Sequence, residues 1–151
     1  MGTLGTIAHD LIGINRKSVF SLEEARTILP FIFRLTQGYS ERVQVLISKI
    51  EAAAKVNNDP HVTEPLEAEA GRLIVEWQTK IQKLGGTPNG HWVVDFDSGD
   101  GYFCWKYPEP QIDFWHHYRD GFSKRVKLSS FNADKTVLTP IEGIERSLNE
   151  R

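Results

Sequence analysis

The chain has little of what marks secreted, membrane or nucleic-acid-binding proteins. Its only cysteine, Cys104, has no partner for an internal disulfide and no CxxC metal spacing around it, which favours a reducing compartment. No apolar run approaches the ~20 residues that cross a bilayer, and the first short apolar run precedes the positive charges, unlike a signal peptide. A net charge of -2 gives no electrostatic attraction to nucleic acid or anionic lipid. We therefore expect a cytoplasmic protein without membrane or nucleic-acid partners.

The rest of the composition is that of an ordinary globular domain. Hydrophobic residues make up 40% of the chain and charged residues 25%, as in typical soluble domains. A chain of this length buries roughly two thirds of its unfolded surface, so a real core is expected. We predict a single domain over residues 19–128, a flexible arm at 1–18 and an extension at 129–151. In the extension, Ile141, Ile144 and Leu148 have the spacing of one short amphipathic helix.

Two long amphipathic helices are predicted in the first half of the chain. Ser21 and Glu24 have the spacing of a capping box, and Pro30 is expected to kink the first helix or to open another. Two apolar stripes with spacings of three and four then follow, separated by residues 57–60 and ended by Gly85. The first stripe is Ile32, Leu35, Tyr39, Val43, Leu46, Ile47 and Ile50, and the second is Leu66, Ala70, Leu73, Trp77, Ile81 and Leu84. Packed face to face, they form an antiparallel helical hairpin.

After the glycines the hydrophobic period changes from helical to that of strands. Residues 91–96 and 102–107 are aromatic and β-branched runs, and the glycines of 97–101 allow a tight reversal between them. Residues 111–115 are expected to return as a third short strand. The predicted fold class is α+β: a long antiparallel helical hairpin packed on a small antiparallel β-hairpin or sheet, with an irregular aromatic loop.

Short motifs spread over residues 19–128 point to a known family. In chain order they are Phe20-Ser21-Leu22-Glu23-Glu24-Ala25, Leu29-Pro30, Val94-Asp95-Phe96, Phe103-Cys104-Trp105-Lys106, Glu109-Pro110, Trp115-His116 and Gly121-Phe122 with Arg125. In this order and spacing they resemble the bacterial family known as domain of unknown function 2203. The chain departs from the family pattern at Pro108, where a glycine is expected. The resemblance implies a shared fold and brings no activity, cofactor or partner.

The first functional hypothesis is a metal site in the aromatic segment 102–125. Glu109 and His116 supply a carboxylate and an imidazole, which suit several divalent ions. His116 and His117 are adjacent and point in different directions, so only one of them joins such a site easily. A third ligand would come from Cys104, Asp95 or His91. The divalent metal is thus the one cofactor that the sequence suggests.

The second hypothesis is a pocket for a small anionic or planar ligand. Arg125 offers a fork of hydrogen-bond donors, and Trp105 or Trp115 offers a stacking face, beside Glu109 and His116. The structural alternative is a packed aromatic core in which Glu109 pairs with Arg125 and His116 hydrogen-bonds a backbone carbonyl. The sequence favours this alternative over either ligand site.

Two further hypotheses concern Cys104 and the helical stripes. Cys104 could act as a nucleophile with His116 or His117 as base, although a buried, inert thiol is the stronger expectation. The two helical stripes could also exceed what the β segment covers and bring two copies together as a homo-oligomer, a noncatalytic interaction module. The sequence does not decide whether the protein is an enzyme.

Overall fold

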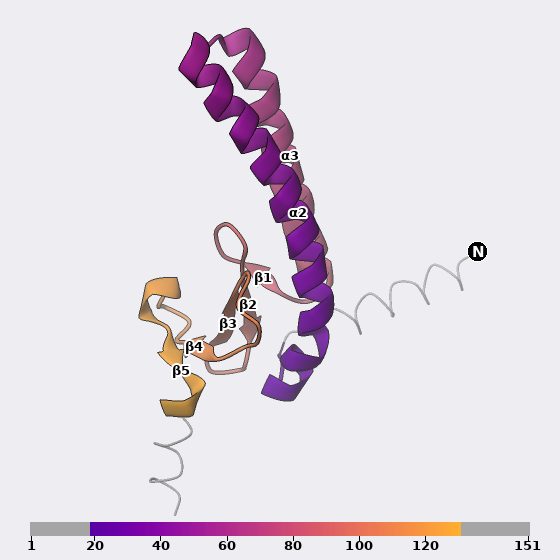
Figure 1. Ribbon diagram of the computed structural model, residues 1–151. Helices are drawn as coiled ribbons and strands as arrows, with labels where there is room; N and C mark the ends of the chain where they lie inside the picture. Colours follow the sequence, from indigo (N-terminus) through magenta and orange to yellow (C-terminus); the bar gives the residue numbers. More distant parts are fainter. Residues whose placement is uncertain (1–18, 131–151) are drawn as a thin grey trace, which may run out of the picture.

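The computed structural model describes residues 19–130 and shows a helical hairpin beside a small sheet. The hairpin consists of α2 (Leu22–Val56) and α3 (Pro60–Lys83). The sheet lies beside the end of the hairpin where α2 begins and α3 ends, while the loop between the helices projects away from it (Figure 1). This arrangement confirms the predicted α+β class. The helix predicted at Ile141 to Leu148 and the proposed arm at 1–18 lie outside the described residues.

The capping box begins α2 as predicted. The Ser21 hydroxyl accepts from the Glu24 backbone N–H at 3.0 Å, and the Glu24 carboxylate accepts from the Ser21 N–H at 2.9 Å. The helix then runs through Pro30 as one element, so no second helix opens there. Leu29 and Ile32 are both buried on either side of this proline, and their packing offsets the hydrogen bond that Pro30 cannot donate.

The two helices meet along most of the predicted apolar stripes, but Ile47 of the first stripe is exposed, because it lies off the face that contacts α3. Trp77 of α3 is fully buried, and its indole N–H donates to the Thr36 hydroxyl of α2 at 2.9 Å. Its ring meets Trp92 edge to face at 4.9 Å, with Trp92 held at a φ of 68°. A non-glycine residue at positive φ is strained, so the packing around Trp92 must hold its backbone in this conformation.

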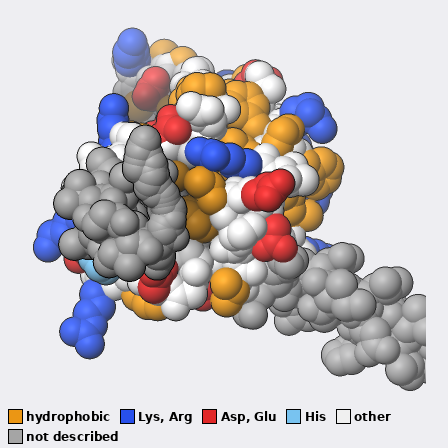
Figure 2. All heavy atoms as spheres, turned by 90° about the horizontal axis from the view of Figure 1, so that it is seen from below, with side chains coloured by type: hydrophobic (Ala, Val, Ile, Leu, Met, Phe, Trp, Pro, Cys, Tyr) orange, Lys and Arg blue, Asp and Glu red, His pale blue; other side chains and the backbone are white. Residues whose placement is uncertain are grey.

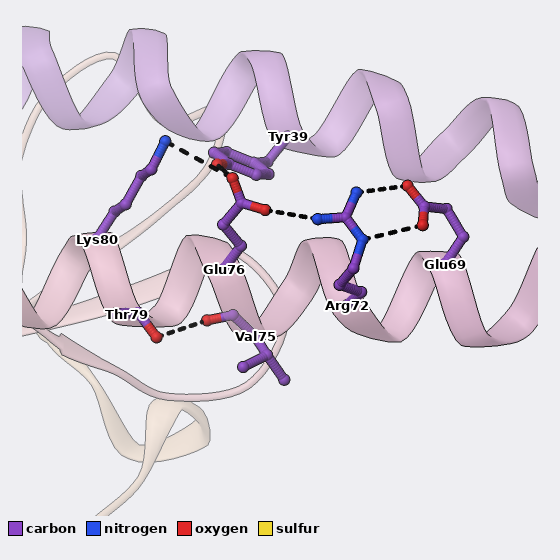
Figure 3. A network of polar contacts seen from close by, with 7 residues as sticks. All are labelled: Tyr39, Glu69, Arg72, Val75, Glu76, Thr79 and Lys80. Carbon is purple, nitrogen blue, oxygen red and sulfur yellow. Dashed lines mark hydrogen bonds and ion pairs between the residues drawn. The ribbon is translucent and has the colours of Figure 1, made fainter.

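A polar network joins the helices further along the hairpin (Figure 3). The Tyr39 hydroxyl of α2 donates to Glu76 of α3 at 2.6 Å, and this hydrogen bond lowers the pKa of the Glu76 carboxyl. Arg72 joins Glu76 to Glu69 by ion pairs of 2.9 and 2.6 Å, while the Lys80 ammonium lies 5.3 Å from the Tyr39 ring centre. Exposed ion pairs contribute little stability, so this network mainly orients Tyr39 across the helix interface.

The sheet has five antiparallel strands in the order of the chain. Their bounds are β1 Thr87–Pro88, β2 Val93–Asp97, β3 Tyr102–Lys106, β4 Phe114–His116 and β5 Val126–Lys127. The central hairpin and the third strand were predicted, whereas the two outer strands were not. At the hairpin turn, a side chain on Gly101 would collide with the Trp115 ring and the backbone carbonyl of His116. Only glycine fits this close approach.

One face of the sheet packs on the helices. Phe96 of β2 meets Phe20 at 5.3 Å, and Trp105 of β3 meets Phe33 of α2 at 6.0 Å between ring centres. These aromatic contacts continue the core of the helix pair into the sheet. The candidate site lies on the opposite face of the sheet.

The outer surface is mixed in character. On the face shown in Figure 2, hydrophobic side chains lie between side chains of both charge signs. Neither α2 nor α3 contains an apolar stretch long enough to span a membrane.

Candidate functional site

The face of the sheet that points away from the helices carries three potential metal ligands. Asp95 and Cys104 are directly opposite each other on β2 and β3, so their side chains share a face. His116 of β4 is opposite Tyr102, which lies two residues before Cys104. Because side chains alternate along a strand, His116 also belongs to this face.

These three side chains form a buried group. One ligand atom from each of Asp95, Cys104 and His116 lies within 4.8 Å of the other two, and all three residues are buried. Among the described residues, no other group of three such side chains has this geometry. A thiol, an imidazole and a carboxylate thus meet at one point of the sheet.

The His116 ring is held from both sides. Its Nδ1 lies 2.8 Å from the His117 carbonyl oxygen, and its Nε2 lies 3.2 Å from Asp95 Oδ1. A carbonyl oxygen can only accept, so Nδ1 carries a proton and donates it. Nε2 therefore faces the carboxylate either with its lone pair, when Nδ1 carries the only proton, or with a second N–H. His117, directly after the end of β4, is exposed while His116 is buried.

Asp95 and Cys104, the two other members of the group, are influenced by their own neighbours. Asp95 Oδ2 accepts a hydrogen bond from the Asn89 side-chain amide at 3.0 Å. Burial raises the pKa of the Cys104 thiol strongly, the negative charge of Asp95 raises it further, and the nearby Arg125 guanidinium opposes part of this rise. A fully buried thiol of this kind is no nucleophile at neutral pH. A metal ion bound here would favour the thiolate, because metal-binding cysteines are deprotonated.

Glu109 and Arg125 form an ion pair whose arginine also lies close to Cys104. The guanidinium binds the carboxylate through two hydrogen bonds of 3.1 and 2.9 Å. Its central carbon also lies 3.9 and 4.0 Å from the ring centres of Phe114 and Phe122, between which it is sandwiched. This is the structural alternative that the sequence favoured, and it leaves Glu109 outside the group around His116. His91 also lies outside this group, and its side chain is exposed.

The two tryptophans proposed as stacking faces are both buried. Trp105 is fully buried in the core and donates from its indole N–H to the Glu109 carbonyl at 2.7 Å. Trp115 is also buried and donates to the Ser98 hydroxyl at 3.0 Å. Neither ring lines the pocket that adjoins His116.

A pocket of about 360 Å³ opens onto the buried group. Asp95 and His116 line it together with the segment that follows β4, whereas Cys104 does not. Its remaining walls are Thr87, Pro88, Asn89, Tyr102, Tyr118, Arg119, Asp120 and Gly121. The pocket is an open depression rather than an enclosed cavity, and its volume is at the lower end of the range for small-molecule sites.

The sequence identified part of this site. His116 was a predicted ligand, and Asp95 and Cys104 were both named as possible third ligands. Asn89 and Arg119 were missed, because loop residues show no periodicity that would relate them to the sheet.

The fold and the buried group define the class of protein: an α+β domain with a helical hairpin and a candidate metal site on its sheet. The sequence profile of the family described as "Uncharacterized conserved protein (DUF2203)" matches residues 18–128. The chain belongs to this family. No curated protein and no solved structure matches the chain.

Proposed function

We propose that the protein binds a divalent transition metal ion, of which zinc is the best-fitting example, through Asp95, Cys104 and His116. The observation that carries the proposal is the convergence of these three buried side chains within 4.8 Å. Thiolate and imidazole favour zinc and similar ions over magnesium or calcium, which prefer oxygen ligands alone.

The arrangement around His116 supports a cation between the side chains. With its proton on Nδ1, the ring faces Asp95 Oδ1 through an unprotonated Nε2 at 3.2 Å. Two lone pairs in contact repel each other unless a positive charge lies between them. A metal ion supplies that charge. A second proton on the ring would supply it too, in the form of a buried ion pair, and the experiment below distinguishes the two.

The distances also suit a metal. Nitrogen and oxygen ligands about 2.1 Å from a tetrahedral zinc ion lie about 3.4 Å apart, close to the 3.2 Å between His116 and Asp95. Metal-binding histidines usually donate their other N–H to a carbonyl or carboxylate, and metal-binding carboxylates are usually hydrogen-bonded. The His117 carbonyl and the Asn89 amide occupy these supporting positions.

The test is metal binding by the full chain purified without an affinity tag. Elemental analysis gives the metal content, and competition with a chromophoric chelator gives the zinc affinity. We expect one zinc ion per chain, an affinity about 10-fold weaker in Asn89→Ala, and a much larger loss in Cys104→Ser. His91→Ala is the matched control, because this exposed histidine lies outside the group.

Asn89 is itself exposed, so its variant keeps the test valid should Cys104→Ser misfold. Equal zinc affinities in the wild type, Asn89→Ala and Cys104→Ser proteins would overturn the proposal. So would the absence of stoichiometric binding, and the His116 and Asp95 side chains would then be a buried ion pair that serves the fold.

A further inference from the structure

The pocket beside the buried group would give a further ligand access to a metal held by Asp95, Cys104 and His116. Three protein ligands leave the fourth position of a tetrahedral ion free. Asp95 and His116 line the pocket, while Cys104 does not. A ligand in the pocket therefore approaches the metal from the side of the carboxylate and the imidazole.

Two aromatic rings form a fixed wall of this pocket. Tyr102 lies between His116 and Tyr118, with ring-centre distances of 5.5 and 5.1 Å. The Tyr118 hydroxyl donates to Asp97 Oδ1 at 2.6 Å, which ties the segment after β4 back to the end of β2. The wall is thus held in place without a ligand.

The pocket also contains polar groups that the described part of the chain leaves unused. Arg119 lines the pocket, and its side chain makes no hydrogen bond or ion pair among the described residues. Asp120, next along the chain, lines the pocket too. An arginine fork matches a carboxylate in shape and charge. The acids Asp95 and Asp120 in the same pocket disfavour a second negative charge on the ligand, and Asp120 can accept from a hydroxyl group.

We infer that the pocket binds a small organic monocarboxylate with a second polar group, such as a 2-hydroxy acid. Arg119 binds its carboxylate, and its hydroxyl group meets the metal and Asp120. This inference rests on the proposed metal site. It assigns a class of ligand to that site on the basis of the charges in the pocket.

The experiment uses cobalt(II) in place of zinc, because its visible spectrum changes when a ligand enters the metal's coordination sphere. The cobalt-loaded full chain is titrated with lactate and, separately, with lactamide, which keeps the hydroxyl group and lacks the negative charge. We expect lactate to change the spectrum saturably in the millimolar range and lactamide to bind about tenfold more weakly. Arg119→Met should weaken lactate binding by about the same factor.

Lys124→Met is the matched control, because Lys124 is an exposed cation nearby that does not line the pocket. Equal binding of lactate and lactamide, no response to lactate, or equal effects of Arg119→Met and Lys124→Met would overturn the inference and leave the metal site standing. If no cobalt–thiolate absorption forms at all, the proposed metal site fails and the ligand inference fails with it.

Discussion

Arg125 gives the sharpest quantitative test of the segment that follows β3. Its side chain is 11% exposed and that of Glu109 is 25% exposed, so this bidentate ion pair is largely shielded from water. We expect a double-mutant cycle with Glu109→Gln and Arg125→Met to show a coupling of about 1 to 2 kcal/mol in the free energy of unfolding. The contacts of the guanidinium with Phe114 and Phe122 add about 0.5 to 1 kcal/mol each. Arg125→Met alone should therefore cost about 2 to 4 kcal/mol.

The assay is urea unfolding of the wild type, both single variants and the double variant. Arg125→Lys should still lose about 1 to 2 kcal/mol, because an ammonium group keeps the charge but has neither the fork nor the stacking plane. The exposed neighbour provides the control, and Lys124→Met should change stability by less than about 0.5 kcal/mol. Additive effects in the cycle would refute the pairing and leave Glu109 available for a ligand.

Three other results are expected. Trp77→Ala should cost about 3 to 5 kcal/mol of unfolding free energy, while Val75→Ala, on the same helix but 60% exposed, should cost less than about 1 kcal/mol; similar losses would refute the helix interface. The hydrogen bond to Asp97 raises the pKa of Tyr118 from 10.0 to about 12. The stability that this hydrogen bond gives is therefore complete below the pKa of Tyr118 in the unfolded chain, and it is lost as the pH rises through the pKa of Tyr118 in the folded protein. Ultraviolet titration should show that Asp97→Asn lowers the pKa of Tyr118, and an unchanged pKa would contradict the hydrogen bond between the two side chains. Sedimentation over a range of concentrations tests the predicted homo-oligomer: a dimer at all concentrations supports it, and a monomer rules it out.

The helices were predictable because their signals are local. The capping box and the three-and-four spacing act within a few turns, and the structure confirms both. Pro30 shows the limit of such signals, since the buried neighbours Leu29 and Ile32 override its preference to end a helix. The outer strands contain two residues each, too few to show a period, and they exist only through pairing with β2 and β4.

The candidate site was predictable only in part, because it depends on strand register. The turn between β2 and β3 brings Asp97 opposite Tyr102, and this register alone places Asp95 opposite Cys104. If the glycine-rich turn is taken to pair Asp97 with Tyr102, the sequence itself predicts that Asp95 lies opposite Cys104. The position of Arg119 depends on how the segment after β4 returns over the sheet, which no local pattern encodes.

X-ray absorption spectroscopy of the zinc-loaded full chain tests the central claim most directly, because it identifies the atoms bound to the metal. We expect one sulfur ligand at about 2.3 Å together with nitrogen and oxygen ligands at about 2.0 to 2.2 Å, including the outer-shell pattern of one imidazole. In Cys104→Ser the sulfur signal should vanish. A zinc ion surrounded only by nitrogen and oxygen in the wild-type protein would contradict the site formed by Asp95, Cys104 and His116.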